Sequence, residues 1–379
     1  MDYIYWPLAW LYSTALFALL ARTIGGTMML KAGPDERIYP VAKLTTIMDA
    51  LAAEGVSPAD VLNGVHLSPS EMSSPATRVS VNQCIECCRN AVRLARDPRF
   101  AYRTGLRFHV SSYGMYGFAM LSSMNFRQTM HVAEKYHELA TPLTEISFKE
   151  EGDKAIWTIA PIPHPEVDAP LYKFLVELHF GIHMSLNRDT MGPSFVAREF
   201  HFTYGPPADA QTYPETFGCD VLFDQPENKL VFDAAWLDRE PKAGNEITYS
   251  AVTGLCDELV EELRHRVGLV GKVREILMVN LMRPTSLEAV AKHLNMTTRT
   301  LRRRLSDEKT SFRGLVDELR MQVAIKYLRD TDLAIEEITY ALGFEDAANF
   351  RRAFRRWTNH GPLEFRRHSR DESDIERPD

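Results

Sequence analysis

The 379-residue sequence predicts an α+β fold in which a mixed helix/strand N-terminal domain precedes an all-α C-terminal domain of two helix-turn-helix units joined by a long helix. Two observations predict this division. Between residues 37 and 240, helical patterns are followed by strand-like runs separated by turn residues. In the last hundred residues, a short apolar-periodic stretch, a turn and a basic stretch at helical spacing occur in that order twice.

The domain boundaries follow changes in composition along the chain. We expect a hydrophobic extension over residues 1–36, the mixed domain over 37–240, a linker helix over 241–267, the all-α domain over 268–367 and an acidic tail over 368–379. The tail has no apolar periodicity and is predicted to be disordered.

The N-terminal extension contains an uncharged stretch, residues 3–21, which is close to the roughly 20 residues that span a bilayer. Arg22 and Lys31 follow it and would place the rest of the chain in the cytoplasm. Asp2 and the absence of a leading positive charge argue against a signal peptide. A membrane tether is one interpretation, and the favoured alternatives are a translation start at Met28 or Met29, so that this stretch is not made, or an accessory extension. All of them place the C-terminal domain in the cytoplasm.

The mixed domain begins with helices and continues with strands. Apolar residues recur at helical spacing from Val41 to Leu51, and Asn125 is the expected N-cap of a helix over 126–140. The other expected elements are helices over 80–96 and 170–187 and strands over 143–149, 155–160, 196–203, 219–224 and 229–233.

Three cysteines, Cys84, Cys87 and Cys88, lie within one predicted helix. Their Cys-x-x-Cys spacing permits a zinc or redox interpretation, but no second ligand pair follows. Cys84 and Cys88 share a stripe with Ala91 and Ala95, which favours small buried side chains. Five cysteines in all are too few for a disulfide framework, which fits a reducing cytoplasm.

The mixed domain is also rich in aromatic residues and histidines. His179 and His183 are four apart and could bind a metal from one helix face, but no third ligand is evident. An aromatic-lined pocket for a small organic effector is therefore the working hypothesis, with no cofactor and no metal. The residues considered are Phe108, His109, Tyr113, Tyr116, Phe118, Tyr136, His137, Tyr172, Phe174, His179, Phe180 and His183.

The first helix-turn-helix unit spans 287–305, with Ser286 as its expected N-cap. In its second helix, Leu301 and Leu305 face inward, which leaves arginines on the solvent side. An arginine there can bind a guanine edge in the major groove through two hydrogen bonds. The predicted DNA-contact residues of this unit are Thr298, Arg299, Arg302 and Arg303.

The second unit spans 335–356 and repeats the pattern, with Gly343 at the turn and Phe350 and Phe354 facing inward. Asn349 is of the type that pairs with adenine through two hydrogen bonds. A helix over 312–329 would hold the two basic helices about 34 Å apart, one DNA turn. The predicted DNA-contact residues of this unit are Ala348, Asn349, Arg351, Arg352, Arg355 and Arg356, of which the last two are expected to meet phosphate.

Charge is divided unevenly along the chain. Residues 268–367 carry 19 Lys and Arg against 13 Asp and Glu, whereas the remainder carries 25 against 38, and the whole chain has a net charge of −7. A basic module on an acidic body fits directed DNA binding, because the body repels phosphate.

The C-terminal residues also resemble a known family. Residues 268–367 are similar to the DNA-binding domain of AraC/XylS transcription regulators, through Leu319–Ala324, Leu342–Phe344, Phe354–Arg356 and Pro362–Arg366. Where that family often has Gly followed by Ser or Thr before the proline, this chain has Asn359-His360-Gly361, so the turn is expected without the capping hydroxyl.

Around Tyr113–Gly117, the N-terminal half resembles the arabinose-binding-type effector domain of the OruR/VirS-like branch of the same family. The resemblance implies a bacterial, effector-responsive activator of a metabolic operon, with double-stranded DNA, a small-molecule effector and RNA polymerase as partners. It also implies a homodimer, for which the stripe Leu255, Leu259, Val260 and Leu263 offers a surface.

An enzyme fused to a DNA-binding module is the competing hypothesis. The DNA-repair precedent needs a reactive cysteine in a Pro-Cys-His-Arg setting, but Cys219 and Cys256 are each followed by Asp. No phosphate-binding loop or Gly-x-Ser-x-Gly motif is found either. The sequence therefore favours a regulator over an enzyme.

Overall fold

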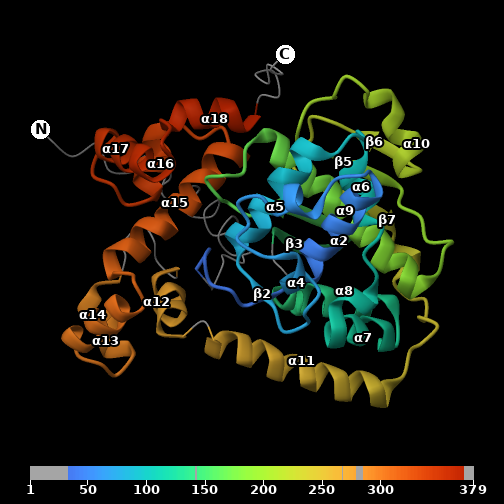
Figure 1. Ribbon diagram of the computed structural model, residues 1–379, viewed down its shortest axis with the longest axis horizontal. Helices are drawn as coiled ribbons and strands as arrows, with labels where there is room; N and C mark the ends of the chain where they lie inside the picture. Colours follow the sequence, from blue (N-terminus) through green and yellow to red (C-terminus); the bar gives the residue numbers. More distant parts are fainter. Residues whose placement is uncertain (1–32, 141–142, 267, 279–284, 371–379) are drawn as a thin grey trace, which may run out of the picture.

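The computed structural model describes residues 33–140, 143–266, 268–278 and 285–370. Two hydrophobic cores organise these residues: the larger extends from Tyr39 to Val260 and the smaller from Val270 to Phe365. Figure 1 shows the larger body beside the smaller helical body, with a long helix passing below the larger one. The predicted α+β class, with a mixed domain followed by an all-α domain, is confirmed.

The larger body contains one five-stranded sheet in the order β3-β4-β7-β5-β6, antiparallel except for the β5–β6 pair. The strands expected over 143–149 and 155–160 form an antiparallel hairpin, with Gly152 at a φ of 61° in the turn between them. A two-stranded ladder, β1 (Tyr39–Pro40) with β2 (Arg78–Val79), precedes it. The sheet strands are β3 (Thr144–Glu151), β4 (Lys154–Pro161), β5 (Glu199–His201), β6 (Asp220–Leu222) and β7 (Lys229–Asp233).

Helix α9 (Ala169–Met191) is the centre of this body, and every residue from Phe174 to Ser185 is buried. It packs against α5, α6 and β4. The crossing with α6 requires glycine, because a Cβ on Gly105 or Gly181 would lie 2.2 Å from a carbonyl oxygen of the other helix. The surrounding helices are α2 (Ala42–Ala53), α3 (Pro58–Val61), α4 (Pro69–Met72), α5 (Val81–Leu94), α6 (Phe100–Gly105), α7 (Gly114–Ser122), α8 (Phe126–Lys135) and α10 (Tyr213–Phe217).

The helix expected over 126–140 is shorter than predicted. Asn125 caps it as expected, accepting from the Gln128 N–H at 2.9 Å, but α8 ends at Lys135 and a 3₁₀ turn covers His137–Leu139. The break places the Tyr136 hydroxyl against Asp257 of the helix α11 (Glu246–Arg266), at 2.9 Å. In α5, Cys84, Cys87 and Cys88 are all fully buried, in agreement with the interpretation as small core side chains.

Helix α11 (Glu246–Arg266) connects the two bodies. Its buried side chains between residues 246 and 263 are Val252, Cys256 and Val260, and α11 contacts α7. Leu255 and Leu259 are 44% and 39% exposed, so part of the predicted apolar stripe faces away from the domain.

The smaller body contains the two predicted helix-turn-helix units. The predicted N-cap Ser286 accepts from the Ala289 N–H at 3.2 Å, and Gly343 has a φ of 69° at the second turn. Asn359 adopts the left-handed conformation, with a φ of 62°. The helices are α12 (Gly268–Met278), α13 (Leu287–His293), α14 (Thr298–Asp307), α15 (Phe312–Asp330), α16 (Ile335–Ala341), α17 (Ala347–Thr358) and α18 (Pro362–Arg370).

The C-terminal boundary differs from the prediction. Helix α18 continues to Arg370, so residues 368–370 are helical rather than part of a disordered tail. The uncharged stretch at residues 3–21 and the acidic residues from 371 onward lie outside the described residues. Within the described part of the chain, no helix combines the length and the apolar composition that crossing a membrane requires.

Candidate functional sites

The first basic surface lies on α14, the second helix of the first unit. Leu301 and Leu305 are fully buried and fix this helix against the core. The three arginines predicted to face outward, Arg299, Arg302 and Arg303, are exposed, and Thr298 is half-buried in the first turn. The helix therefore presents cations on the face opposite its anchor.

The second basic surface lies on α17, which Phe350 and Phe354 anchor in the same core. Its exposed residues include Ala348, Arg351, Arg352, Arg355 and Arg356, while Asn349 is half-buried. Helix α15 runs between the two units and buries Leu315, Leu319 and Leu328. Figure 1 shows α14 and α17 on either side of this helix.

Several side chains of the second surface are held by internal contacts. Asn349 Nδ2 donates to Asp346 Oδ2 at 2.7 Å, and Arg352 Nη2 donates to Asn349 Oδ1 at 2.6 Å. Arg351 pairs with Glu336 and Arg356 with Asp317, each at 3.3 Å. Asn349 must exchange these contacts before its amide can pair with a base.

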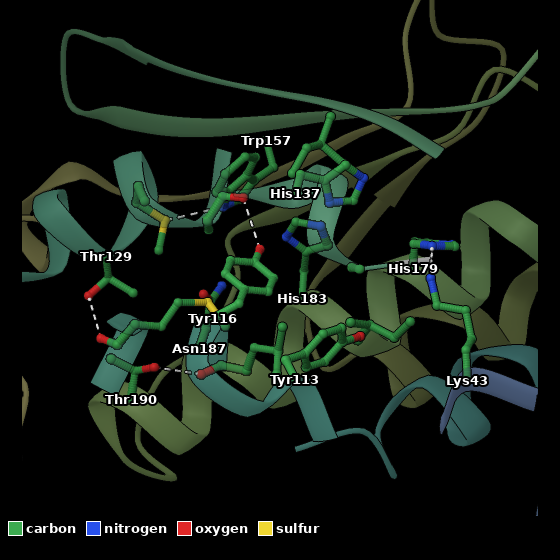
Figure 2. Close-up of a pocket in the computed structure, with 17 residues that line it drawn as sticks. Lys43, Tyr113, Tyr116, Thr129, His137, Trp157, His179, His183, Asn187 and Thr190 are labelled. Atoms are coloured by element: carbon green, nitrogen blue, oxygen red, sulfur yellow. Dashed lines mark hydrogen bonds between the residues drawn. The ribbon is translucent and has the colours of Figure 1, made fainter. Parts of the chain in front are cut away.

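The larger body encloses a cavity of about 30 Å³ between α2, α7, α8, α9 and the sheet. Lys43 and His179 lie at one end of the lining and Thr129 and Thr190 at the other (Figure 2). Of the aromatic and histidine residues predicted for an effector pocket, five line it: Tyr113, Tyr116, His137, His179 and His183.

The other predicted pocket residues lie elsewhere. His109 is exposed and bonds to Asp189 at 3.0 Å, and Phe118 is exposed. Phe108 lies in a neighbouring groove. Tyr136, Tyr172, Phe174 and Phe180 pack in the core. Sequence reasoning missed Lys43, Trp157 and Asn187, which line the cavity from α2, β4 and α9.

Lys43 is 4% exposed, and its Nζ lies 3.3 Å from His179 Nε2. The Nδ1 of His179 donates to the Leu175 carbonyl, so Nε2 carries the lone pair that accepts from the ammonium group. Burial lowers the pKa of Lys43 to about 8. The ammonium group therefore remains mainly charged at neutral pH within an almost dry site.

Among the residues whose burial the structure describes, four histidines are buried: His137, His164, His179 and His183. Burial lowers the pKa of His137 and of His164 to about 4, that of His183 to about 3, and that of His179 well below its usual value. All four imidazoles are neutral at pH 7.

Comparison with known proteins identifies the chain. Residues 55–241 match the family model described as the arabinose-binding domain of AraC transcription regulator, N-term, and residues 290–368 match a helix-turn-helix domain model. The ornithine utilization regulator of Pseudomonas aeruginosa is 30% identical over 330 residues, which cover 87% of this chain and 96% of that protein. The chain belongs to the AraC family of transcription regulators.

Two further relatives of this AraC-family regulator cover it less completely. The transcriptional regulator VqsM of Pseudomonas aeruginosa is 28% identical over 267 residues, or 69% of this chain and 82% of that protein. The urease operon transcriptional activator of Escherichia coli is 40% identical over 88 residues, or 23% of this chain and 30% of that protein. Both domains of the regulator therefore have relatives among DNA-binding transcription regulators, as the sequence predicted.

The two domains of the regulator contact each other through charged side chains of α15. Lys326 Nζ lies 2.6 Å from Glu145 Oε2 at the start of β3, with both side chains largely buried. Arg329 donates to the Pro161 carbonyl at 2.8 Å and lies over the Tyr172 ring. These contacts join the helix between the two helix-turn-helix units directly to the sheet of the N-terminal domain.

A cluster that sequence reasoning did not consider lies at the start of α18. Among the described residues, one group of three potential metal ligands comes close together: His360, Glu364 and His368, with ligand atoms within 4.8 Å of one another. Glu364 accepts from the Gly361 N–H at 3.1 Å and contacts the His360 ring at 3.2 Å. Glu364 thus satisfies the N–H of the residue that precedes the helix, which is the contact that the acidic residue of a capping box makes.

Proposed function

We propose that this regulator is an effector-responsive activator of a metabolic operon, in which a small organic molecule in the N-terminal domain controls how the DNA-binding domain is held. The Lys326–Glu145 contact carries the proposal, because it joins the DNA-binding domain to a strand that also borders the cavity. Thr144 and Ile146 flank Glu145, and the Thr144 carbonyl accepts from His137 Nε2 at 2.9 Å. A molecule in the cavity therefore acts one residue away from the domain contact.

On DNA, we propose that α14 and α17 enter successive major-groove segments, as the exposed arginines on both helices favour. Arg299, Arg302 and Arg303 would contact bases in one segment, and Ala348, Asn349 and Arg352 in the next. Arg355 and Arg356, later in α17, would contact phosphate. Thr298, in the first turn of α14, and Arg351 complete the proposed interface.

We also propose that the regulator binds DNA as a homodimer and contacts RNA polymerase. The exposed Leu255 and Leu259, with Ile247 at 84% exposed, give α11 an apolar face that a second copy could cover. The Escherichia coli relative is named as a transcriptional activator, which supports activation rather than repression as the proposed effect on transcription.

The test of this function is DNA binding by the full chain and by a fragment lacking residues 1–245. The fragment retains the complete smaller core, from Val270 to Phe365, and should bind the same operator without responding to small molecules. DNase footprints of both proteins on genomic fragments beside metabolic operons would show paired protected segments about one turn apart. A fragment that fails to protect any site bound by the full chain would contradict the arrangement of two reading helices.

A further inference from the structure

We propose that the cavity of the N-terminal domain recognises a small organic carboxylate, whose acid group lies beside Lys43 and whose apolar body extends along Tyr113 and Tyr116. The proposal rests on the proposed function, in which this cavity is the effector site, and adds the charge class of the effector.

The charged groups of the cavity lining are all basic. The described residues that line it include one lysine and three histidines but no aspartate or glutamate. The three imidazoles are neutral at pH 7, which leaves the ammonium group of Lys43 as the positive charge of the cavity. An anion beside a desolvated ammonium group recovers energy that burial has cost, whereas a cation there adds repulsion.

A second buried donor lines the same space. Asn187 is buried, and its Nδ2 has no hydrogen-bond partner within the described chain. Asn187 follows His183 and His179 at intervals of four along α9, so the three side chains share one face of that helix. An unsatisfied buried donor is unfavourable until an acceptor reaches it. A ligand rich in acceptor oxygens meets this requirement.

The available space fixes how the molecule must lie. The enclosed cavity, at about 30 Å³, holds little more than one water-sized group. An open groove of about 350 Å³ adjoins it and shares Lys43, Tyr113 and Tyr116 with its lining. The carboxylate therefore fits in the enclosed part and the body in the groove. Apolar residues of the groove include Ile38, Phe108, Met115, Leu139, Leu259 and Leu263.

The groove also connects the proposed ligand to the DNA-binding domain by a second route. Leu259, Glu262 and Leu263 of α11 form one of its walls, and α11 leads directly into α12 of the smaller body. A molecule lying in the groove would contact the helix between the domains. Glu262 is the one carboxylate of the groove lining among the described residues, and it lies on the side formed by α11 rather than among the histidines.

The charge of the cavity favours a different ligand from the diamino acid in the name of one relative. The Pseudomonas aeruginosa relative is named for ornithine utilization, and ornithine carries two ammonium groups. In this chain one of those groups would have to lie near Lys43 in the cavity. Like charges at such a distance disfavour binding. We therefore expect the cavity to bind organic monoanions more tightly than diamino acids.

The experiment measures ligand-dependent thermal stabilisation of the full chain at about pH 7, where Lys43 is mainly protonated, with probes matched in shape and different in charge. The probes are benzoate, benzamide, benzylamine, octanoate and ornithine, each at about 5 mM and constant ionic strength. Benzoate or octanoate should raise the melting temperature by about 2 °C or more, and the neutral and cationic probes should not. No shift with either carboxylate, or a larger shift with ornithine or benzylamine, would overturn the proposal.

Two variants assign the effect to the cavity. Lys43→Met keeps the apolar stem and removes the charge, so the rise in melting temperature with benzoate or octanoate should disappear. Lys149→Met, at an exposed ion pair on β3, is the matched control and should keep the shift. If benzoate or octanoate still raises the melting temperature of Lys43→Met, the carboxylate does not bind beside Lys43. Should Lys43→Met fail to fold, the benzoate–benzamide comparison on the unmodified protein remains decisive.

The same protein samples are tested for operator binding in a mobility-shift assay. Operator binding without any carboxylate effect on melting would leave the regulator intact and reject the ligand class. Absence of operator binding under all conditions would instead reject the proposed function.

Discussion

Removing Lys326 should separate the two domains rather than unfold either one. In the structure its ammonium group lies 2.6 Å from Glu145, with side-chain exposures of 17% and 9% for Lys326 and Glu145. Breaking a buried pair by removing one partner costs about 3 to 5 kcal/mol, because it leaves the other charge buried and uncompensated. Since both side chains keep some exposure, we expect about 3 kcal/mol for Lys326→Met.

Because the pair lies between the two domains, its loss changes the equilibrium of domain docking rather than the folding of either domain. Glu145 belongs to the N-terminal domain and Lys326 to the DNA-binding domain, so the carboxylate regains water as soon as the domains move apart. About 3 kcal/mol corresponds to a shift of roughly 150-fold in the equilibrium between docked and undocked arrangements. The variant should therefore show a larger radius of gyration by small-angle X-ray scattering and effector-independent operator binding.

Lys149→Met is the control, because Lys149 and Glu151 form a pair of similar length, 2.7 Å, on the same strand but exposed to 44% and 59%. An exposed pair contributes about 0 to 1 kcal/mol, so this variant should behave as the unmodified protein. Adding Glu145→Gln to Lys326→Met removes the buried carboxylate and should restore much of the docking. Identical scattering and identical operator affinity for Lys326→Met and Lys149→Met would refute the reasoning.

Three further outcomes follow from the described side chains. Arg302→Ala should relax base preference in one half of the operator at a cost of about 1 to 3 kcal/mol, with Arg304→Ala as a same-helix control; equal losses on every sequence would reveal a phosphate contact instead. Asn359→Ala should lower the free energy of unfolding by about 1 kcal/mol in urea titrations, and Asn359→Gly should not, because the residue has a φ of 62°. The four buried histidines have folded pKa values depressed by burial, so their stabilising contribution is complete above about pH 6.5 and is lost as the pH falls toward 4. Melting temperature should therefore drop between about pH 7 and pH 5, by the equivalent of about 2 kcal/mol for each histidine whose folded pKa is about 4, and a flat profile would contradict the neutral assignment.

The DNA-binding domain was predictable because its signals are local. The Ser286 cap, the positive φ of Gly343 and the buried Leu301 and Leu305 each depend on residues within a few positions of one another. The departure at Asn359 was interpretable for the same reason, since the left-handed turn depends mainly on that residue.

The cavity and the domain contact were not predictable, because both are made by residues distant in sequence. Lys43 meets His179 across 136 positions, and Glu145 meets Lys326 across 181. A lone lysine in an amphipathic helix has the same local pattern whether it is solvated or buried, so no local pattern distinguishes Lys43. The early end of α8 has a similar origin, because Tyr136 leaves the helix to meet Asp257 of α11.

The geometry of β3 places these two unpredicted features side by side. Successive residues of a strand point to opposite faces, so Ile146 lines the cavity while Glu145 points toward α15. The Thr144 carbonyl is held by His137, whose ring is itself part of the cavity lining.

A ligand can shift domain docking only by the difference between its affinities for the docked and undocked arrangements. A hundredfold difference supplies about 2.7 kcal/mol, which is close to the roughly 3 kcal/mol expected for the loss of Lys326 alone. A ligand with that preference would therefore shift the docking equilibrium about as far as Lys326→Met does, without any change in the chain.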